Sequence, residues 1–430
     1  MFESLSIRDL HRPRLIFLLS CVILLVYASF SSPFPARLSI YEIFTGIISI
    51  VLLAISTRFA FNVTPFRKSI VSVYLSFFIL ISLGLFSFFR LENDIQSFFR
   101  DIISLCFLFF LIPSFLIHAF SDQETHLVKF FPECLVLSGL IQSIRSVFNS
   151  QIAEQGGFAS LGKSTLEGDR LWFQYDLFVI FACIYSIYCL ARLLSGSATI
   201  SLNRPTYSFL FLYRLFCILI PFISFLFILQ RASMILAVGS CVFSVYLNRL
   251  QIKFIVLNKS ILLPLFSFLI IPLLILALIA LQPAGIVSDF VHALSIKSSN
   301  QSGVFYKLRE IPAILDLASP LNILSGHGLG SVYYNPEINK VVRFTHNIFT
   351  YIIFKFGILG LLSIFGVFGI KFCHSFTKIY KLLSLKNLSP SSIDPFIFAK
   401  LAAFLSLLIT LLQPSYKALS FPFILGLFIA

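Results

Sequence analysis

The stretch of residues 69–89 reads SIVSVYLSFFILISLGLFSFF and contains no charged side chain. A helix rises about 1.5 Å per residue, so about 20 apolar residues cross the roughly 30 Å hydrocarbon core of a bilayer. This stretch therefore predicts a transmembrane helix. Its composition is typical of the whole chain, in which 58% of the 430 residues are hydrophobic, 12% are charged and 53 are Phe. Such a balance argues against a soluble globular domain.

Apolar segments of similar length recur from one end of the chain to the other. They predict an all-α, polytopic transmembrane helix bundle of about 12 spans within a single integral membrane domain, residues 1–430. The spans are expected near residues 15–31, 38–57, 69–89, 99–119, 127–148, 171–194, 208–229, 232–248, 260–282, 346–370, 396–412 and 417–430. The first one follows a basic start but lacks a clear small-x-small cleavage site, so we expect a retained span rather than a secretory signal.

Basic residues gather in the short loops on one side of the predicted bundle. They are Arg58, Arg67, Lys68, Arg192, Arg204, Arg249, Lys253, Lys259, Lys371, Lys378, Lys381 and Lys386. Short cytoplasmic loops carry an excess of Lys and Arg, so this side and the N-terminus are expected to face the cytoplasm. The net charge of +14 then reflects topology, and nucleic acid is not an expected partner.

The eight cysteines lie inside apolar runs or at their edges, and none forms a CxxC pair. This distribution predicts neither a disulfide framework nor a zinc site. No GxxxxGK[ST] motif occurs, which argues against ATP-driven transport by this chain alone.

Two long segments are then expected on the opposite, periplasmic face: a smaller loop, 149–170, and a larger loop, 283–345. Long loops on a rigid scaffold usually carry binding or catalysis, so function is expected there. In the larger loop, apolar residues recur at helical spacing from Phe305 to Leu315, and Pro312 could start a second short helix. Short amphipathic helices on the membrane surface are therefore expected in this loop.

The sharpest motif is Gly326-His327-Gly328-Leu329-Gly330, near the end of the larger loop. Thr345-His346-Asn347 follows where the loop re-enters the membrane, and Phe356-Gly357-Ile358-Leu359-Gly360-Leu361 lies inside the next span. The glycine-rich stretch predicts a tight turn, because it neither follows a strand of a βαβ unit nor faces the cytoplasm, as a dinucleotide site would.

These motifs, in this order and topology, resemble the O-antigen ligase and polymerase superfamily. Upstream, Leu229-Gln230-Arg231-Ala232-Ser233 resembles the family's Ser-Arg motif, with Gln230 in place of the usual Ser. The resemblance covers residues 220–372, and elsewhere only the number and spacing of spans agree. It implies a GT-C-like fold and an inverting glycosyl transfer from an undecaprenyl-pyrophosphate-linked glycan at the periplasmic face, without metal or cofactor.

The candidate residues suit that chemistry. Cleavage of the sugar–pyrophosphate bond leaves concentrated negative charge, which guanidinium groups can hold, and by resemblance Arg231 and Arg309 are the phosphate-binding candidates. The neutral imidazole of His346 could accept the proton of the acceptor hydroxyl as general base, the role that the family implies. For all three, an ordinary interfacial residue is the alternative. Further candidates for substrate contacts are His327, Arg343, Asn347 and Arg170. For these residues the alternative is an ordinary position on a turn or in a solvated loop.

The acceptor is not fixed by the sequence. Another lipid-linked glycan would make the chain a polymerase, whereas a lipid A-core or a protein would make it a ligase. The acids and bases of the larger loop slightly favour a polymerase. A chain-length regulator is a further candidate partner.

Two other functional classes stay open. Glu92-Asn93-Asp94 is an acid-x-acid pattern that could bind Mg²⁺ or Mn²⁺ in a metal-dependent glycosyltransferase. The number of spans and the polar residues at membrane depth would also suit a flippase for lipid-linked oligosaccharides or another transporter. These polar residues are Glu133, Gln142, Arg145 and Asp176. The motif residues gather on one face rather than at the midplane, which argues against transport. Acid pairs are common beside spans and the His-Asn motif lies elsewhere, which favours the metal-independent transferase.

Overall fold

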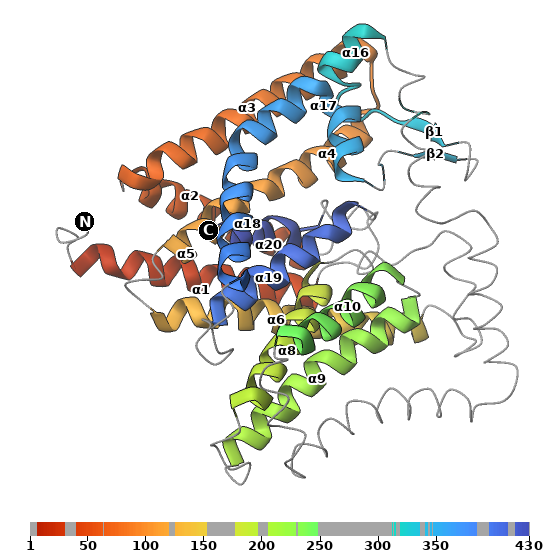
Figure 1. Cartoon of the computed structure of the whole chain (residues 1–430). Helices are drawn as coiled ribbons and strands as arrows, with labels where there is room; N and C mark the ends of the chain where they lie inside the picture. Colours follow the sequence, from red (N-terminus) through yellow and green to blue (C-terminus); the bar gives the residue numbers. More distant parts are fainter. Residues whose placement is uncertain are drawn as a thin grey trace, which may run out of the picture.

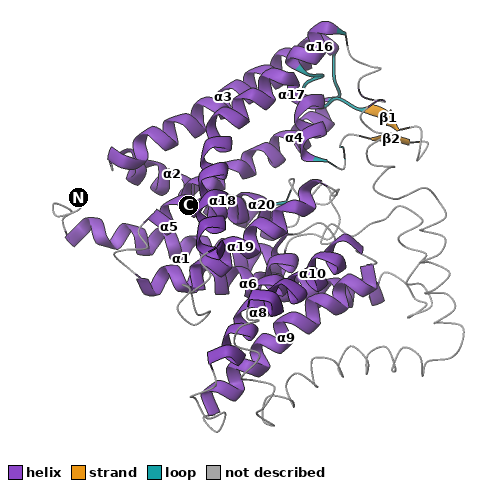
Figure 2. Ribbon diagram, in the orientation of Figure 1, coloured by secondary structure: helices purple, strands orange, loops and turns teal. Residues whose placement is uncertain are grey.

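The computed structural model describes residues 7–30, 40–62, 64–119, 125–152, 177–196, 205–228, 231–247, 312, 314, 319–335, 340–342, 345, 347–384, 395–411 and 418–429. Helices make up nearly all of these residues, as Figure 2 shows. The elements are α1 (Ile7–Phe30), α2 (Ile40–Asn62), α3 (Thr64–Leu91), α4 (Ile95–Cys106), η1 (Phe107–Phe110), α5 (Leu111–Ala119), α6 (Thr125–Ile152), α8 (Leu177–Gly196), α9 (Pro205–Ile228), α10 (Arg231–Leu247), α16 (Pro320–Ser325), β1 (Tyr333–Asn335), β2 (Lys340–Val342), α17 (Ile348–Ile364), η4 (Phe365–Gly369), α18 (Ile370–Ser384), α19 (Pro395–Leu407), η6 (Leu408–Leu411) and α20 (Ser420–Ile429).

The all-α prediction is confirmed, with one short antiparallel hairpin, β1–β2, beside the described helices. Each predicted span that falls within the described residues contains helix, whereas the span expected at 260–282 lies outside them. By length and hydropathy alone, one described helical segment, residues 71–91 of α3, could cross a membrane.

Helix α8 lies at the centre of one group of helices. It packs against α6, α9, α10 and α19 (Figure 1), and its side chains from Leu177 to Tyr188 are all nearly inaccessible. Gly139 of α6 lets that helix approach closely, because a side chain there would overlap the backbone of Phe178. A helix that is apolar on all sides can thus be covered completely by its neighbours.

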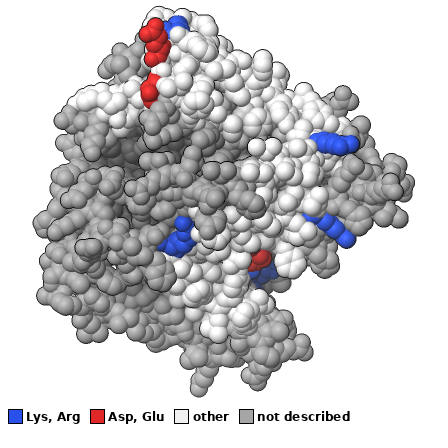
Figure 3. All heavy atoms as spheres, turned by 180° about the vertical axis from the view of Figure 1, so that it is seen from behind, with Lys and Arg blue, Asp and Glu red and all other residues white. Residues whose placement is uncertain are grey.

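Helix α3 is also apolar on all sides but is covered on one side only. Val73, Phe77 and Leu80 form its buried stripe at helical spacing, facing α17. On the other side, Phe78 and Phe89 are 70% and 72% exposed. In the view of Figure 3 the described surface is largely uncharged, with Lys, Arg, Asp and Glu in a few separate spots. Contiguous exposed apolar surface of this kind is unusual for a soluble monomer.

Helix α18 occupies a segment that the sequence suggested to be a basic loop. Its Ser375 and Ile379 are buried, and Phe372 contacts Phe404 of α19 and Phe428 of α20 with ring centroids 6.1 and 4.7 Å apart. The segment is helical because its apolar residues recur at helical spacing and pack on the C-terminal helices, while Lys381 is exposed. The lysines of this segment predicted a loop, and that prediction overlooked the helical spacing of its apolar residues.

Candidate functional site

The glycine-rich turn, residues 326–330, lies where α3, α4 and α17 converge, directly after α16 (Figure 1). Ser319 caps α16, since its hydroxyl accepts a hydrogen bond from the Asn322 N–H at 3.3 Å, and Pro320 opens the helix. Proline is tolerated in this first turn because its missing N–H would have no helical partner. Gly326, with φ of 78°, ends α16. The sequence around α16 therefore explains how the chain enters the turn.

The turn fills a break in α17. At Gly357 the backbone leaves the helical region, with φ of 66° and ψ of −167°. The carbonyl oxygens just before this break find new donors in the turn: Phe354 O accepts from the His327 N–H at 2.8 Å, and Lys355 O from the Gly328 N–H at 3.0 Å. The two glycine motifs of the sequence thus form one structural unit, and the predicted tight turn is confirmed by positive φ angles at its three glycines.

Asn93 holds the other side of the turn. Its Nδ2 donates to the carbonyl oxygens of His327 and Leu329, at 2.8 and 3.1 Å. The Leu329 N–H in turn donates to Gly84 O at 3.3 Å, and the Leu329 side chain is completely buried. Buried irregular backbone is tolerated only where its polar groups are satisfied, and here α3, α17 and the loop before α4 satisfy them.

A buried ion pair completes the attachment. Lys355 Nζ lies 2.7 Å from Asp101 Oδ2, and the two side chains are 0% and 2% exposed. The same Asp101 oxygen accepts from the Gly330 N–H at 2.9 Å, and Lys355 Nζ also donates to Ser331 O at 2.7 Å. We call these four residues the clamp. A buried ion pair is tolerated when its remaining hydrogen-bonding groups are satisfied, and the clamp uses them to fasten the turn to α4 and α17.

The start of α17 is fixed by Asn347. Its Oδ1 accepts from the Phe349 N–H at 2.8 Å, which caps the helix, and its Nδ2 donates to Leu411 O at 3.0 Å. Thr345 is fully buried, and its hydroxyl donates to Asn347 O at 2.8 Å. The motif Thr345-His346-Asn347 therefore begins a helix whose first turn is anchored to η6.

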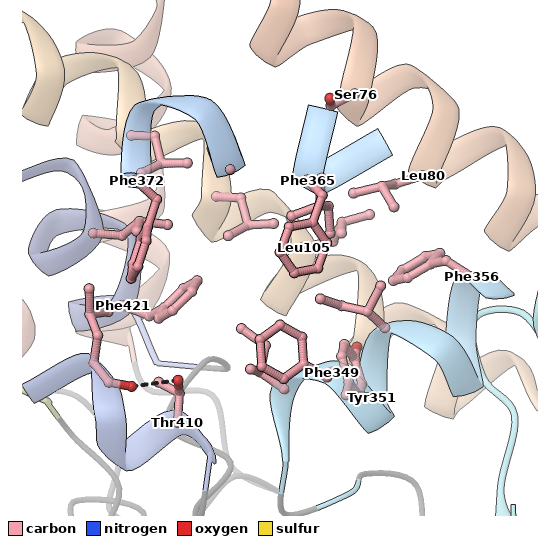
Figure 4. Close-up of a pocket in the computed structure, with 18 of the residues that line it drawn as sticks. Ser76, Leu80, Leu105, Phe349, Tyr351, Phe356, Phe365, Phe372, Thr410 and Phe421 are labelled. Atoms are coloured by element: carbon pink, nitrogen blue, oxygen red, sulfur yellow. Dashed lines mark hydrogen bonds between the residues drawn. The ribbon is translucent and has the colours of Figure 1, made fainter. Parts of the chain in front are cut away.

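An apolar cavity of about 310 Å³ lies beside the first turns of α17 (Figure 4). It is lined by residues of α3, the helices from α4 to α5, α17, η4, α18, α19, η6 and α20, among them Phe349, Tyr351 and Phe365. Its two aliphatic hydroxyls donate hydrogen bonds to backbone carbonyls: Ser76 donates to Ser363 O and Thr410 donates to Leu407 O. The cavity has the size of a small ligand pocket and suits an apolar ligand.

The structure describes only some of the predicted site residues. His327 is partly buried, with its ring centroid 5.0 Å from that of Phe354, and Asn347 caps α17 as described. Arg231 is the first residue of α10, but its side chain lies outside the described residues. The other candidates, His346, Arg309, Arg343 and Arg170, also lie outside them, as do the amphipathic helix expected from Phe305 and the loop 149–170.

Sequence reasoning missed Lys355 and Asp101, and it named Asn93 only as the middle of the acid-x-acid pattern. Lys355 is an isolated charge in an apolar segment, and Asp101 follows Arg100 at the start of another. Charges within apolar segments usually mark a special role. The search for such residues could have found them, but not their pairing, since they are 254 residues apart in the chain.

The acid-x-acid segment has structural roles in the described part of the chain. Asp94 Oδ2 accepts from the Ser97 N–H at 2.7 Å and so caps α4, while Asn93 holds the turn. Glu92 is exposed, with φ of 51°. Within the described residues, no group of three or more His, Cys, Asp or Glu side chains has the arrangement of a metal site.

Polar residues that lie within the apolar runs of the sequence connect helices. Glu133 of α6 pairs with Arg214 of α9, whose guanidinium lies 5.5 and 5.1 Å from the ring centroids of Tyr185 and Tyr213. Arg145 Nη1 donates to Ala28 O at 2.6 Å, which links α6 to α1. Asp176 lies outside the described residues.

Comparison with known proteins adds no assignment: no protein-family model matches the chain, and no curated protein matches its sequence.

Proposed function

We propose that this chain is an integral membrane glycosyltransferase that acts on glycans linked to undecaprenyl pyrophosphate at the periplasmic face. The membrane setting is supported by α3, which is apolar on all sides yet exposes Phe78 and Phe89. Lipid is the solvent that suits such a surface, and the proposed bundle has about 12 spans. In this setting the turn, which contacts Gly84 and Asn93 at the C-terminal end of α3, would lie toward the periplasmic end.

The observation that carries the proposal is the apolar cavity beside the start of α17. Ile348, Phe349 and Ile352, which follow the Thr345-His346-Asn347 motif directly, line it. A polyprenyl donor has a long apolar chain and a charged head, so it needs an apolar site next to a polar one. The cavity supplies the first, and the motif residues that precede it are the candidates for the second.

The proposed chemistry needs a base and a charge-stabilising group. His346 would take the proton of the acceptor hydroxyl as the anomeric carbon is attacked with inversion, and the pyrophosphate leaves with its charge held by Arg231 and Arg309. The mechanism uses no metal. Polymerase and ligase share these steps and differ only in the acceptor, and a chain-length regulator would act on a polymerase.

The test is glycan transfer in proteoliposomes that contain a lipid-pyrophosphate oligosaccharide donor, with EDTA present. We expect wild-type transfer to persist, and His346→Ala to lose at least about 100-fold in kcat, the usual contribution of a general base. His374→Ala is the matched control, because His374 is exposed on α18, and it should transfer normally.

Separate acceptors then decide the type of enzyme. Transfer to a second lipid-linked glycan indicates a polymerase, and transfer to a lipid A-core or a protein indicates a ligase. A normal rate for His346→Ala, or no transfer to any acceptor, refutes the proposal. Lipid-linked oligosaccharide flipping by the same proteoliposomes would then be measured next.

A further inference from the structure

The first part of α17 is a rigid rod with two attachments. From Ile348 to the break at Gly357 it spans roughly 13 Å, at about 1.5 Å per residue. At its start, Asn347 Nδ2 donates to Leu411 O at 3.0 Å. At its end, Lys355 Nζ reaches Asp101 Oδ2 and Ser331 O, each at 2.7 Å. The position of the motif that precedes the rod therefore depends on both attachments.

Of the two attachments, the clamp has the higher cost in desolvation free energy, because it buries two charges. Apolar residues of similar volume could replace a buried ion pair with little loss of stability and often with a gain. Lys355 and Asp101 are both buried, and each also bonds a backbone group of the turn, Ser331 O and the Gly330 N–H. An apolar pair could not make these two hydrogen bonds, so they indicate that the role of the ion pair is to hold the backbone of the turn.

We propose that Lys355 and Asp101 are positioning residues: through Gly330 and Ser331 they lock the glycine turn into the break of α17 and so fix the rod that follows His346. Neither residue needs to touch substrate. Their effect on catalysis rests on the proposed function, whereas their effect on the turn does not.

Two double variants separate hydrogen bonding from charge. Lys355→Gln with Asp101→Asn removes both charges but keeps a donor for Ser331 O and an acceptor for the Gly330 N–H. Lys355→Met with Asp101→Leu removes the charges and the hydrogen bonds, and Leu keeps the branching and the number of side-chain heavy atoms of Asp. Both variants leave the net charge of the chain unchanged, so they form a matched pair.

The first readout is independent of any enzymatic activity. His327→Cys is introduced into the wild type and both double variants, and its reaction with a membrane-impermeant maleimide is followed on the peptide that carries the introduced thiol. We expect the Met/Leu variant to react about tenfold faster than the wild type, because the turn opens locally, and the Gln/Asn variant to stay near the wild-type rate. Leu321→Cys, exposed on α16, should react alike in all three.

The second readout is glycan transfer per folded molecule, measured on the monodisperse fraction. The Met/Leu variant should lose about tenfold or more in kcat with little change in donor KM, since a small misplacement at the reacting centre is costly. The Gln/Asn variant should keep most of its kcat. A purely structural clamp would lower the folded fraction and leave kcat per folded molecule equal in both variants.

The outcomes are distinct. Labelling of both double variants at the wild-type rate overturns the clamp, whatever the enzyme does. Faster labelling of the Met/Leu variant with unchanged kcat overturns its positioning role. If wild-type chain transfers no glycan, the proposed function fails, and the labelling rates still decide whether the clamp holds the turn.

Discussion

The ion pairs Lys355–Asp101 and Glu133–Arg214 both join helices, and their surroundings differ. Lys355 and Asp101 lie at a place where a helix is broken and a loop enters the core, and both are fully buried. Glu133 and Arg214 join two regular helices, and the Glu133 side chain is 29% exposed. The first pair satisfies backbone groups as well as each other, whereas aromatic rings cover the guanidinium of the second.

This difference indicates what buried charge can do in an apolar bundle. A regular helix satisfies its own backbone, so the Glu133–Arg214 pair only orients α6 and α9. A loop that enters the core brings carbonyl and N–H groups that need partners, and the charges of the clamp satisfy two of them, Ser331 O and the Gly330 N–H. Loss of one charge should therefore cost much more in the clamp than between α6 and α9.

The largest effect is expected for Lys355→Met. It leaves the Asp101 carboxylate buried without its cation, which typically lowers the free energy of unfolding by about 3–5 kcal/mol. SDS titration of the protein in mixed micelles would measure it. Arg58→Met, at an exposed position on α2, is the control and should unfold like the wild type. Equal stability of the two variants would contradict the importance of the clamp.

Gly357→Ala should have the second-largest effect on the free energy of unfolding. The new methyl group would overlap the Leu324 carbonyl, and an L-residue at φ of 66° is strained as well, so we expect a loss of about 2–4 kcal/mol. Gly366→Ala is the control, because no atom lies within 4 Å of the added carbon. The same titration compares them, and a wild-type midpoint for Gly357→Ala would show that the break in α17 is not required.

Arg214→Met tests the second pair and should have a smaller effect, about 1–2 kcal/mol. Glu133 can turn toward its exposed side when the guanidinium is lost, so the variant mainly loses charge-assisted hydrogen bonds and ring contacts. Glu133→Gln keeps an acceptor for Arg214 and should cost less still. A loss as large as that of Lys355→Met would remove the distinction between the two regions.

The sequence predicts the helices well for a simple reason. Long apolar runs such as residues 69–89 can only be helical in an apolar bundle, and α3 covers that run. The tight turn at 326–330 was also predictable, since glycines spaced by single residues favour positive φ.

The junction between the turn and α17 was not predictable from the sequence. Gly357 and Gly360 stand in the same motif, yet only Gly357 leaves the helical conformation, because the turn docks there. Lys355 and Asp101 look like unrelated charges until the fold brings them together. Local patterns determine the elements, but contacts between distant segments determine which glycine bends and which charges pair.

The smallest effect is expected for Gly239→Ala, and it should be stabilising. Gly239 lies inside α10, which contacts α9 of the second pair, and nothing lies within 4 Å of a carbon added there. Alanine loses less backbone entropy than glycine in a helix, so the free energy of unfolding should rise by about 0.5–1 kcal/mol. The SDS titration should show a shift opposite in sign to that of Gly357→Ala. A destabilised Gly239→Ala would mean that α10 is not a regular helix at this point. The helices around the Glu133–Arg214 pair could then no longer serve as the regular region in the comparison.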